Sequence, residues 1–453
     1  MDNFLAKTIE QRVEQHANNM PSKAAIICNG NTMTYSQLWS FVLQESHNLE
    51  SNNGLRSGML NFFRAKQDAS FIIEYLATHL IGAVAVPLEK DFPAERLNSL
   101  KSKYGSTVLQ QDSDDIENIA DILFTTGSTG QQKGVMESYS AILADADNLI
   151  NAQGFSSDMV FIICGPLNHI GSLSKIWPVL YLGGTLIIAD GMKDIDALFR
   201  LFDYPSNHIA TFMVPASIRM VLQFGKERIA RVADKIEFIE TGGAAISQSD
   251  MDELCSLLPN TRLYNTYAST ETGIVCTYDY NHNPCIAGCT GRPMKNSSVS
   301  ISTDGTIICK GKTLMSGYFN DESLTKNILH DNAVFTSDLG EIDSQGFLHI
   351  KGRNNDVINI GGYKVSPTEI ENVANSFPSI TESICIPYHS DIFGDTIKLL
   401  YVSTSGTNIT KRDIARYLSA NLESYKQPRL FEQVESIKHT YNGKLDRKFY
   451  RQN

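Results

Sequence analysis

At 453 residues the chain is longer than one ordinary domain, so its length predicts two or more domains. Hydrophobic residues make up 42% of the chain and charged residues 20%, which is the composition of a soluble globular protein. The formal net charge of -11 argues against a nucleic-acid-binding protein, because such proteins usually present a basic face.

The N-terminus and the cysteines indicate the compartment in which the protein works. Residues 1–19 are polar, so we expect no secretory signal, and no apolar run approaches the ~20 residues that an integral membrane segment needs. The cysteines are scattered without a disulfide framework. Cys285 and Cys289 lie near His282, but a zinc site usually needs a second ligand pair, and none is visible. We therefore interpret the cysteines as reduced thiols and expect a cytoplasmic protein.

The residues up to about 350 alternate short apolar runs with longer amphipathic stretches, which predicts an α/β fold. Strands are expected at Ala24–Cys28, Val84–Leu88, Asp121–Thr125, Val160–Cys164, Thr185–Ala189 and Ile236–Glu240. Several of these runs end in Gly, Ser, Pro or Asn, as happens where strand C-termini feed ligand-binding loops. From about Gly288 to Phe347 the chain becomes β-rich, and residues 299–311 (VSISTDGTIICKG) have the alternation and turn chemistry of a hairpin.

The C-terminal part of the chain has the pattern of a second unit. Residues 352–364 (GRNNDVINIGGYK) are dense in Gly and Asn, which is typical of a hinge or of a plain loop. A helix should follow, with Ser366 as its N-cap, Pro367 in its first turn and Glu369 completing a capping box. Strands at Ser383–Pro387 and Ile397–Ser403 and a helix at Lys411–Leu422 complete the unit. We predict a large multi-sheet α/β domain over residues 1–354 and a small mobile α+β domain over residues 355–453.

The strongest local motif is TTGSTGQQKGV, residues 125–135, which follows a strand-like run directly. Its glycines let backbone N–H groups converge on phosphate oxygens, its hydroxyls add donors, and Lys133 adds positive charge. The Walker pattern places its lysine directly after a glycine and before Ser or Thr, whereas two residues separate Gly130 from Lys133 here. A P-loop NTPase is therefore disfavoured. Taken alone, the motif is also compatible with an ordinary Gly/Ser/Thr turn.

This loop closely resembles the phosphate loop of the adenylate-forming superfamily, which includes acyl- and aryl-CoA synthetases, luciferases and peptide-synthetase adenylation domains. Further resemblances follow in the family's order: GGAA at 242–245, YNTYASTE at 264–271, TSDLG at 336–340, GR at 352–353 with the segment after it, and NGKLDR at 442–447. Each motif is weak alone, but their occurrence in order over nearly the whole chain is hard to obtain by chance.

The resemblance implies catalytic roles for particular residues. Thr270 would contact phosphate, and Glu271 would ligate a Mg²⁺ ion that bridges the nucleotide phosphates. Lys444 would neutralise charge between the carboxylate and the α-phosphate. Activating a carboxylate at a phosphate brings two anions together, so a site of this kind has to supply cations where charge develops.

The resemblance also implies a nucleotide site and a thiol channel. Tyr267 would offer its flat ring to adenine, while Asp338 and Arg353 would hold the ribose. Gly361 and Gly362 would let a thin pantetheine arm approach the backbone. The other nucleotide-binding residues implied by the motifs are Thr125, Thr126, Gly127, Ser128, Thr129, Gly130, Lys133, Gly243, Ala244, Ala245 and Asn265.

Residues 166–171 (PLNHIG) resemble the family's Pro-Leu-x-His segment at the mouth of the acid pocket, which would make His169 a catalytic-site gate or wall. A purely structural histidine is the alternative. Residues 212–217 (FMVPAS) are expected to add an apolar wall. Two positions depart from the family: Ala268 stands where Gly is usual, and Asn355 stands at the hinge, where Asp or Lys is common. Asn355 keeps hydrogen-bonding capacity but not charge, which leaves the energetics of the hinge open.

We therefore predict an ATP-dependent ligase that forms an acyl-adenylate with Mg²⁺ and then an acyl thioester with coenzyme A. A phosphopantetheine-bearing acyl-carrier or peptidyl-carrier protein is the alternative acceptor. Residues 166–172 hold no Asp or Glu to pair an α-ammonium group, so we favour an aromatic or aliphatic acid over an amino acid. A non-catalytic nucleotide-binding regulator is disfavoured, because Lys444, Glu271 and Thr270 are all present.

Overall fold

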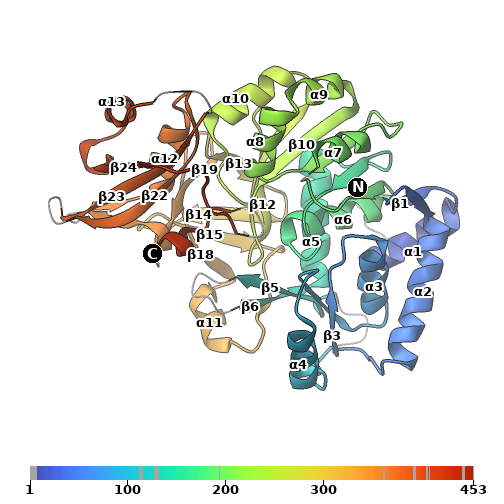
Figure 1. The fold of residues 1–453 in the computed structure, drawn as a ribbon. Coiled ribbons are helices and arrows are strands. Elements are labelled where there is room, and N and C mark those ends of the chain that lie inside the picture. The colour runs from blue at the N-terminus through green and yellow to red at the C-terminus, as the bar shows by residue number, and fades with distance from the viewer. Residues whose placement is uncertain are drawn as a thin grey trace.

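The computed structural model describes residues 8–111, 116–126, 132–192, 194–360, 363–390, 394–404, 407, 409–440 and 444–451 (Figure 1). Its strands form four sheets, the largest of which has 14 strands. That sheet runs in the order β14-β15-β18-β19-β13-β12-β11-β10-β9-β7-β8-β1-β2, with β17 paired to β18. A 5-stranded sheet has the order β16-β6-β5-β4-β3. The C-terminal part holds the pair β20-β21 and a 3-stranded sheet, β22-β23-β24.

The strands of the largest sheet come from three parts of the chain. Its N-terminal and central strands are β1 (Ala24–Cys28), β2 (Asn31–Thr34), β7 (Val160–Ile163), β8 (Thr185–Ile188), β9 (Ile209–Phe212), β10 (Ile236–Gly242), β11 (Arg262–Ser269) and β12 (Gly273–Asp279). Its remaining strands are β13 (Cys289–Pro293), β14 (Ser297–Ile301), β15 (Thr306–Gly311), β17 (Leu329–His330), β18 (Ala333–Ile342) and β19 (Leu348–Arg353). The pairs from β1 through β8, β7 and β9 to β10 and β11 are parallel, so their carboxyl ends meet at one edge.

The second sheet carries the strand that leads to the phosphate motif. Its members are β3 (Leu60–Arg64), β4 (Val84–Leu88), β5 (Ile119–Thr126), β6 (Gln132–Ser138) and β16 (Gly317–Tyr318). β5 and β6 pair antiparallel on either side of the motif, and Thr125 lies opposite Lys133. The two arms of the phosphate motif are therefore held together by a β-ladder.

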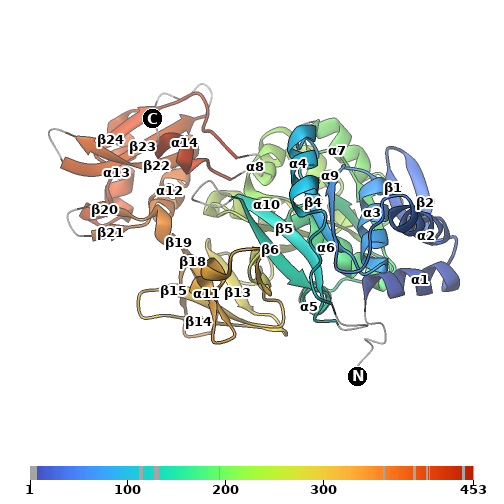
Figure 2. The same ribbon diagram turned by 90° about the horizontal axis from the view of Figure 1, so that it is seen from below.

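Helices cover the faces of both sheets, as expected for an α/β architecture (Figures 1 and 2). Those before residue 200 are α1 (Ile9–Asn19), α2 (Tyr35–Ser51), α3 (Ala69–Leu80), α4 (Ala94–Tyr104), α5 (Tyr139–Gln153) and α6 (Ile170–Leu182), with α7 (Ile195–Leu201) ending just past it. Those that follow are α8 (Pro215–Phe224), α9 (Lys226–Arg231), α10 (Gln248–Leu257) and α11 (Glu322–Ile328). The largest hydrophobic core lies between α1, α2, α3, α5, α6 and the sheets, and Trp177 of α6 is fully buried in it.

The C-terminal residues form a unit with a hydrophobic core of its own, drawn in orange and red in Figures 1 and 2. A short 3₁₀ turn, Asn354–Asp356, leads into it. Its elements are β20 (Ile358–Ile360), β21 (Tyr363–Val365), α12 (Pro367–Asn375), β22 (Ile380–Ser390), β23 (Gly394–Ser403), α13 (Lys411–Asn421), β24 (Leu430–Gln433) and α14 (Arg447–Arg451). The predicted fold class, a large multi-sheet α/β part with a small α+β part, is confirmed. The boundary between residues 354 and 355 stays a prediction.

The start of α12 corrects one local prediction. Ser366 is the N-cap and Pro367 the first helical residue, as expected, but the capping box is absent. The Ser366 hydroxyl instead donates to the carbonyl oxygen of Lys351 at 2.7 Å, and Glu369 pairs with Lys426 at 2.6 Å. Both side chains therefore make contacts outside the helix end, with partners that local sequence spacing does not reveal.

Candidate active site

Lys444 reaches the large domain from the C-terminal unit. The backbone N–H of Thr440 donates to the Lys444 carbonyl at 2.7 Å, and His439 forms a β-bridge with Leu445. Arg447 makes two hydrogen bonds to the Glu371 carboxylate, at 2.5 and 2.6 Å. The segment that begins at Lys444 is therefore fixed to α12 by Arg447.

The Lys444 side chain lies against the loop after β10 and among charged groups of the large domain. A methyl group placed on Gly243 would come within 3.9 Å of the lysine Cε. Burial lowers the pKa of Lys444, Arg353 lowers it further, and Asp338 and Glu271 act in the opposite direction. One cation from the C-terminal unit therefore lies within electrostatic reach of the two carboxylates that the motifs single out.

Asp338 is held by two neighbours that the motifs also predicted. It lies opposite Arg353 across the β18–β19 ladder, and the Arg353 Nε donates to its Oδ1 at 3.0 Å. The Tyr267 hydroxyl, at the far end of β11, donates to its Oδ2 at 2.9 Å. Tyr267 is only 7% exposed: its ring belongs to a buried hydrophobic cluster with Val275 and Ile307, and its hydroxyl fixes the carboxylate. A fixed, buried carboxylate suits a ligand with adjacent hydroxyl groups, such as a ribose.

Glu271 follows β11 in a turn that Ser269 and Thr272 shape by reciprocal hydrogen bonds. One carboxylate oxygen accepts a 2.9 Å hydrogen bond from the Tyr318 hydroxyl. The Lys133 ammonium lies 5.5 Å from the centre of the same tyrosine ring. Mg²⁺ is commonly held by one or two carboxylates together with substrate phosphate oxygens, so a single half-buried glutamate beside a phosphate motif fits that ion.

Tyr318 was not predicted as a site residue, although it connects the phosphate motif to Glu271. It lies in the short strand β16, whose partner is β6. A single Gly-Tyr pair in a sequence carries no spacing signal, so only the pairing of β16 with β6 reveals its position.

The remaining predicted nucleotide residues are placed in part. Gly243, Ala244 and Ala245 form an exposed bend after β10, next to Lys444. Asn265 is buried in β11 and donates through its side chain to the Cys289 carbonyl at 2.7 Å. Thr270 is half-buried beside Glu271. Four residues of the phosphate motif lie outside the described residues: Gly127, Ser128, Thr129 and Gly130. Thr126 is described by its backbone alone. Gly361 and Gly362 also lie outside, and Asn355 is described by its backbone only.

His169 lies at the start of α6, within electrostatic reach of Lys444. It is the N-cap residue of α6, and burial, followed by the nearby Lys444 charge, lowers its pKa to about 4. The imidazole is therefore neutral at physiological pH. Phe212, at the end of β9, lies against the first turn of the same helix, because a methyl group on Gly171 would meet the phenyl ring at 2.9 Å. The predicted apolar wall therefore contacts the start of the helix whose N-cap is His169.

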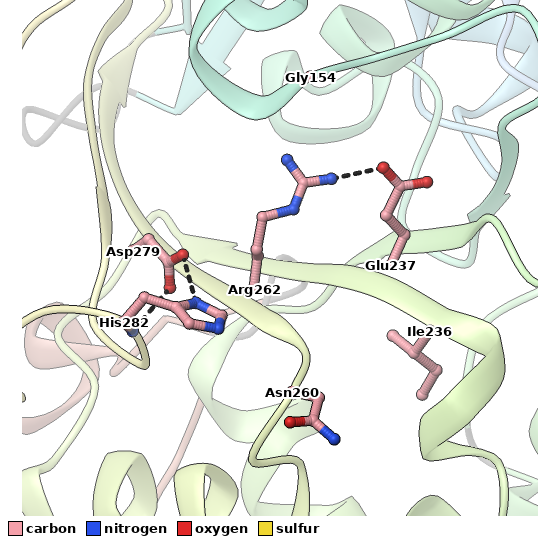
Figure 3. Close-up of a pocket in the computed structure, with 7 residues that line it drawn as sticks. All are labelled: Gly154, Ile236, Glu237, Asn260, Arg262, Asp279 and His282. Carbon is pink, nitrogen blue, oxygen red and sulfur yellow. Dashed lines mark hydrogen bonds and ion pairs between the residues drawn. The ribbon is translucent and has the colours of Figure 1, made fainter.

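A separate open pocket of about 640 Å³ lies at the other edge of the largest sheet (Figure 3). Ile236 and Arg262, which begin β10 and β11, line it together with Gly154, Glu237, Asn260, Asp279 and His282. The motif residues lie at the opposite ends of the same strands. This pocket is therefore distinct from the candidate active site.

Other features of the described residues bear on cofactors and location. All eight cysteines are free, and within the described part of the chain no group of three or more His, Cys, Asp or Glu side chains is arranged to hold a metal ion. Among the described helices, none has both the length and the apolar character that a bilayer crossing requires.

Comparison with known proteins agrees with this geometry. The family model described as AMP-binding enzyme matches residues 13–115 and 99–319, and the model of the AMP-binding enzyme C-terminal domain matches residues 369–444. A 2-succinylbenzoate–CoA ligase of Staphylococcus aureus is 31% identical over 80% of this chain and 70% of its own length. A 2-succinylbenzoate–CoA ligase of Staphylococcus epidermidis is 26% identical over 96% of each chain.

Solved structures share the fold at low sequence identity. ATP-bound MatB from Rhodopseudomonas palustris has a TM-score of 0.88 at 22% identity and covers 99% of both chains. The o-succinylbenzoate CoA synthetase of Bacillus subtilis, in complex with its acyl-adenylate intermediate, has a TM-score of 0.83 at 22% identity over 97% of both chains.

The fold and the site define an adenylating enzyme with a large and a small part. The chain belongs to the family of AMP-binding enzymes. It is an AMP-forming acid–thiol ligase of the acyl-CoA synthetase type, which confirms the enzyme class predicted from its motifs.

Proposed function

We propose that Lys444, Glu271 and Asp338, with their neighbours, form the site at which this ligase activates a carboxylic acid with ATP. The observation that supports it most is convergence. Lys444, from the end of the chain, lies within electrostatic reach of Glu271, Asp338 and Arg353, and its charge reaches His169. These groups come from five separate segments of the sequence. If they served only the stability of the fold, each segment would have to bring a charged or ionisable group to the same place for a different reason.

In the first half-reaction a carboxylate oxygen of the acid bonds to the α-phosphorus of ATP, and the bond to the leaving pyrophosphate breaks. Lys444 stabilises the charge that accumulates where the two anions meet. Asp338, held by Tyr267 and Arg353, orients the ribose. Lys133 and the phosphate motif bind the phosphates, and Glu271 would hold Mg²⁺. When bound, Mg²⁺ supplies positive charge to the phosphate oxygens.

In the second half-reaction the thiol sulfur attacks the acyl carbon, the bond to the phosphate oxygen breaks, and AMP leaves. We propose that rotation about residues 354–356 withdraws Lys444 for this step, because domain closure often completes a second catalytic arrangement. Gly361 and Gly362 would then admit the pantetheine arm, and the small domain would begin at residue 355. The Asp356 carboxylate lies 3.3 Å from Arg447, so this turn is linked directly to the lysine motif.

For the substrates we propose coenzyme A as the thiol and a small aromatic acid as the acyl donor. Both choices are supported by the relatives, which are named as 2-succinylbenzoate–CoA ligases. The Phe212 ring, which lies against the first turn of α6 after His169, supports the aromatic acid as well. No contact among the described residues favours a carrier protein as acceptor. The free cysteines support a cytoplasmic location.

The test is pyrophosphate release with ATP and Mg²⁺ over a panel of aryl, short-chain, long-chain and amino acids. Each acid is assayed with coenzyme A, with a pantetheinylated carrier protein and with neither. We expect release that depends on an aryl acid and increases with coenzyme A. An increase with the carrier protein alone would replace the proposed acceptor. Tight ATP binding without release for any acid would contradict the site assignment.

A further inference from the structure

A fully buried ion pair lies beneath the apolar wall of the acid pocket. The Lys175 ammonium of α6 donates to the Glu240 Oε1 of β10 at 2.9 Å, and both side chains are 1% exposed. The same ammonium lies 5.5 Å from the centre of the Phe212 ring. Purely apolar packing is the usual way to fill such a position, because removing two charges from water is costly.

The pair lies on the strand that leads to the Lys444 contact. Gly243 touches the Lys444 side chain, and Gly242 lies against the Phe212 ring, which a methyl group there would meet at 3.7 Å. Glu240 and Gly242 belong to the same strand and are two residues apart, so the Glu240 side chain and a methyl group placed on Gly242 face the same side of the sheet. Gly171 and Lys175 are one helical turn apart on α6 and both face Phe212. The ion pair and the Phe212 ring therefore lie next to each other between β10 and α6.

The pair leaves one hydrogen-bond acceptor unused. Glu240 Oε2 is buried and has no hydrogen-bond partner among the described residues. Leaving a buried acceptor in this state is unfavourable, unless a bound molecule supplies a donor. The nearby Asp145 adds little charge, because burial raises its pKa to about 8. Lys175 and Glu240 therefore neutralise each other and leave an unsatisfied oxygen.

Building on the proposed function, we propose that Lys175 and Glu240 form a distal subsite that selects the acid. The acid of this chain is an aromatic monocarboxylate with a hydrogen-bond donor, a hydroxyl or an amino group, on the side of the ring away from its carboxyl group. That donor bonds to Glu240 Oε2, and the ring packs against Phe212. The acid named in the relatives, 2-succinylbenzoate, carries a second carboxylate instead.

A second carboxylate fits this subsite poorly. The Lys175 ammonium is already paired with Glu240, so another anion beside this pair would be buried without a counter-charge of its own. A site built to bond a hydroxyl also discriminates strongly against the analogue that lacks it, because the buried acceptor is then left unpaired. The subsite therefore predicts both a preferred and a disfavoured class of acid.

The experiment measures acid-dependent ATP–pyrophosphate exchange with the full chain. The acids are benzoate, 3-hydroxybenzoate, 4-hydroxybenzoate, 4-aminobenzoate and 2-succinylbenzoate. We expect kcat/KM for at least one hydroxy or amino acid to exceed that for benzoate by tenfold or more, and to exceed that for 2-succinylbenzoate. Exchange with no acid would instead count against the proposed function, so the two failures are distinguishable.

Two variants of the subsite test whether the pair causes the preference. The double variant Lys175→Met with Glu240→Leu removes both charges together at similar volume, and we expect it to reduce the ratio of hydroxy acid to benzoate to about one, mainly through KM. If the double variant does not fold, Glu240→Gln, which keeps the shape of the side chain, provides the test instead. It should reduce the ratio of hydroxy acid to benzoate at least threefold.

The matched control is a second ion pair on the same strand. Glu237 pairs with Arg262 at 2.5 Å in the open pocket at the opposite end of β10 (Figure 3). Glu237→Leu with Arg262→Met should leave the ratio unchanged. The proposal is overturned if the wild type prefers 2-succinylbenzoate or benzoate. It is also overturned if the ratio of hydroxy acid to benzoate is unchanged in the subsite variants. Either result would assign Lys175 and Glu240 to fold stability alone.

Discussion

Lys444 is the residue whose placement most constrains the chemistry, because a single ammonium group lies near both Glu271 and Asp338. We expect Lys444→Ala to reduce acyl-adenylate formation by about 10²–10³-fold, the usual loss when one preorganised charge-stabilising group is removed. Thioester formation from supplied acyl-adenylate should remain near the wild-type rate. Single-turnover measurement of each half-reaction checks this. Equal loss of both would show that Lys444 also serves the second step.

The lowered pKa of Lys444 predicts an asymmetric pH profile. In the proposed mechanism Lys444 acts in its charged form, and its pKa lies below the ordinary 10.5, chiefly because of burial. Adenylation should therefore decline, as pH rises, at a lower pH than an ordinary lysine would give. His169, with a pKa of about 4, should add no inflection near 6.5. A pH profile of the first half-reaction tests this, and Lys444→Ala should lack the alkaline limb. An inflection near 6.5 that disappears in His169→Ala would contradict the neutral-histidine assignment.

Tyr267 offers a test of the ribose site at the level of one hydroxyl. Tyr267→Phe keeps the ring and removes the hydrogen bond to Asp338, so the carboxylate is held by Arg353 alone. A hydrogen bond to a charged group contributes about 1.5–3 kcal/mol, so we expect KM for ATP to rise about tenfold with little change in kcat. Tyr264→Phe in the same strand is the control, since its hydroxyl accepts from Arg262 instead. An unchanged KM in Tyr267→Phe would remove Tyr267 from the site.

At the scale of elements, the turn after β11 depends on one glycine. Gly273 has φ +66°, and a methyl group there would approach both Asp145 carboxylate oxygens and the Thr313 carbonyl at 2.7 Å. Gly273→Ala should therefore destabilise the protein by about 1–3 kcal/mol and displace the turn that carries Glu271. Denaturant unfolding and the Mg²⁺ dependence of adenylation measure the two effects.

Gly305 provides the matched control for this substitution. It has φ +87°, but a methyl group there meets nothing closer than 3.9 Å. Gly305→Ala therefore isolates the backbone cost, which should be the smaller of the two. If both substitutions cost the same, contact with Asp145 and Thr313 does not fix the turn.

The regular elements were largely predictable because their signals are local. β1 and β4 match the predicted ranges Ala24–Cys28 and Val84–Leu88 in full, since short apolar runs bounded by polar residues define their own limits. The predicted hairpin is β14–β15. The predicted capping box at Ser366 was wrong, because its two side chains have partners that are distant in sequence. The Ser366 hydroxyl donates to the Lys351 carbonyl, and Glu369 pairs with Lys426.

At the scale of the whole molecule, a polar contact holds the C-terminal unit against the large domain. Arg219 of α8 lies 3.1 Å from Asp250 and 3.5 Å from Glu382 of β22, and Glu382 also pairs with His439 at 2.8 Å. His439 lies close to Lys444 along the chain. The contact therefore favours the arrangement in which the lysine reaches Gly243.

We expect Glu382→Gln to weaken this arrangement. Adenylation should slow about threefold to tenfold, because a partly exposed cluster of ion pairs contributes only a modest free energy. Thioester formation from supplied acyl-adenylate should be unchanged or faster. The hydrogen bond to Glu382 raises the pKa of His439. Below the ordinary histidine pKa of 6.5 the protonated ring strengthens the contact between the two units in full. This strengthening is lost as the pH rises through the raised pKa of His439. Glu432→Gln, which breaks a pair with Lys398 inside the small unit, is the control. Equal slowing of both half-reactions in Glu382→Gln would contradict the proposed role.

The sequence by itself determined the class of enzyme, the α/β architecture and the residues of the main motifs, because these depend on local patterns that recur in order along the chain. Only the tertiary structure decided what surrounds those residues. Tyr318 beside Glu271, Glu382 beside Arg219 and the Lys175–Glu240 pair beneath Phe212 each join segments far apart in sequence. Such contacts follow from strand order and domain docking rather than from any local spacing, so the proposed selection of the acid by Lys175 and Glu240 could not be predicted from the sequence.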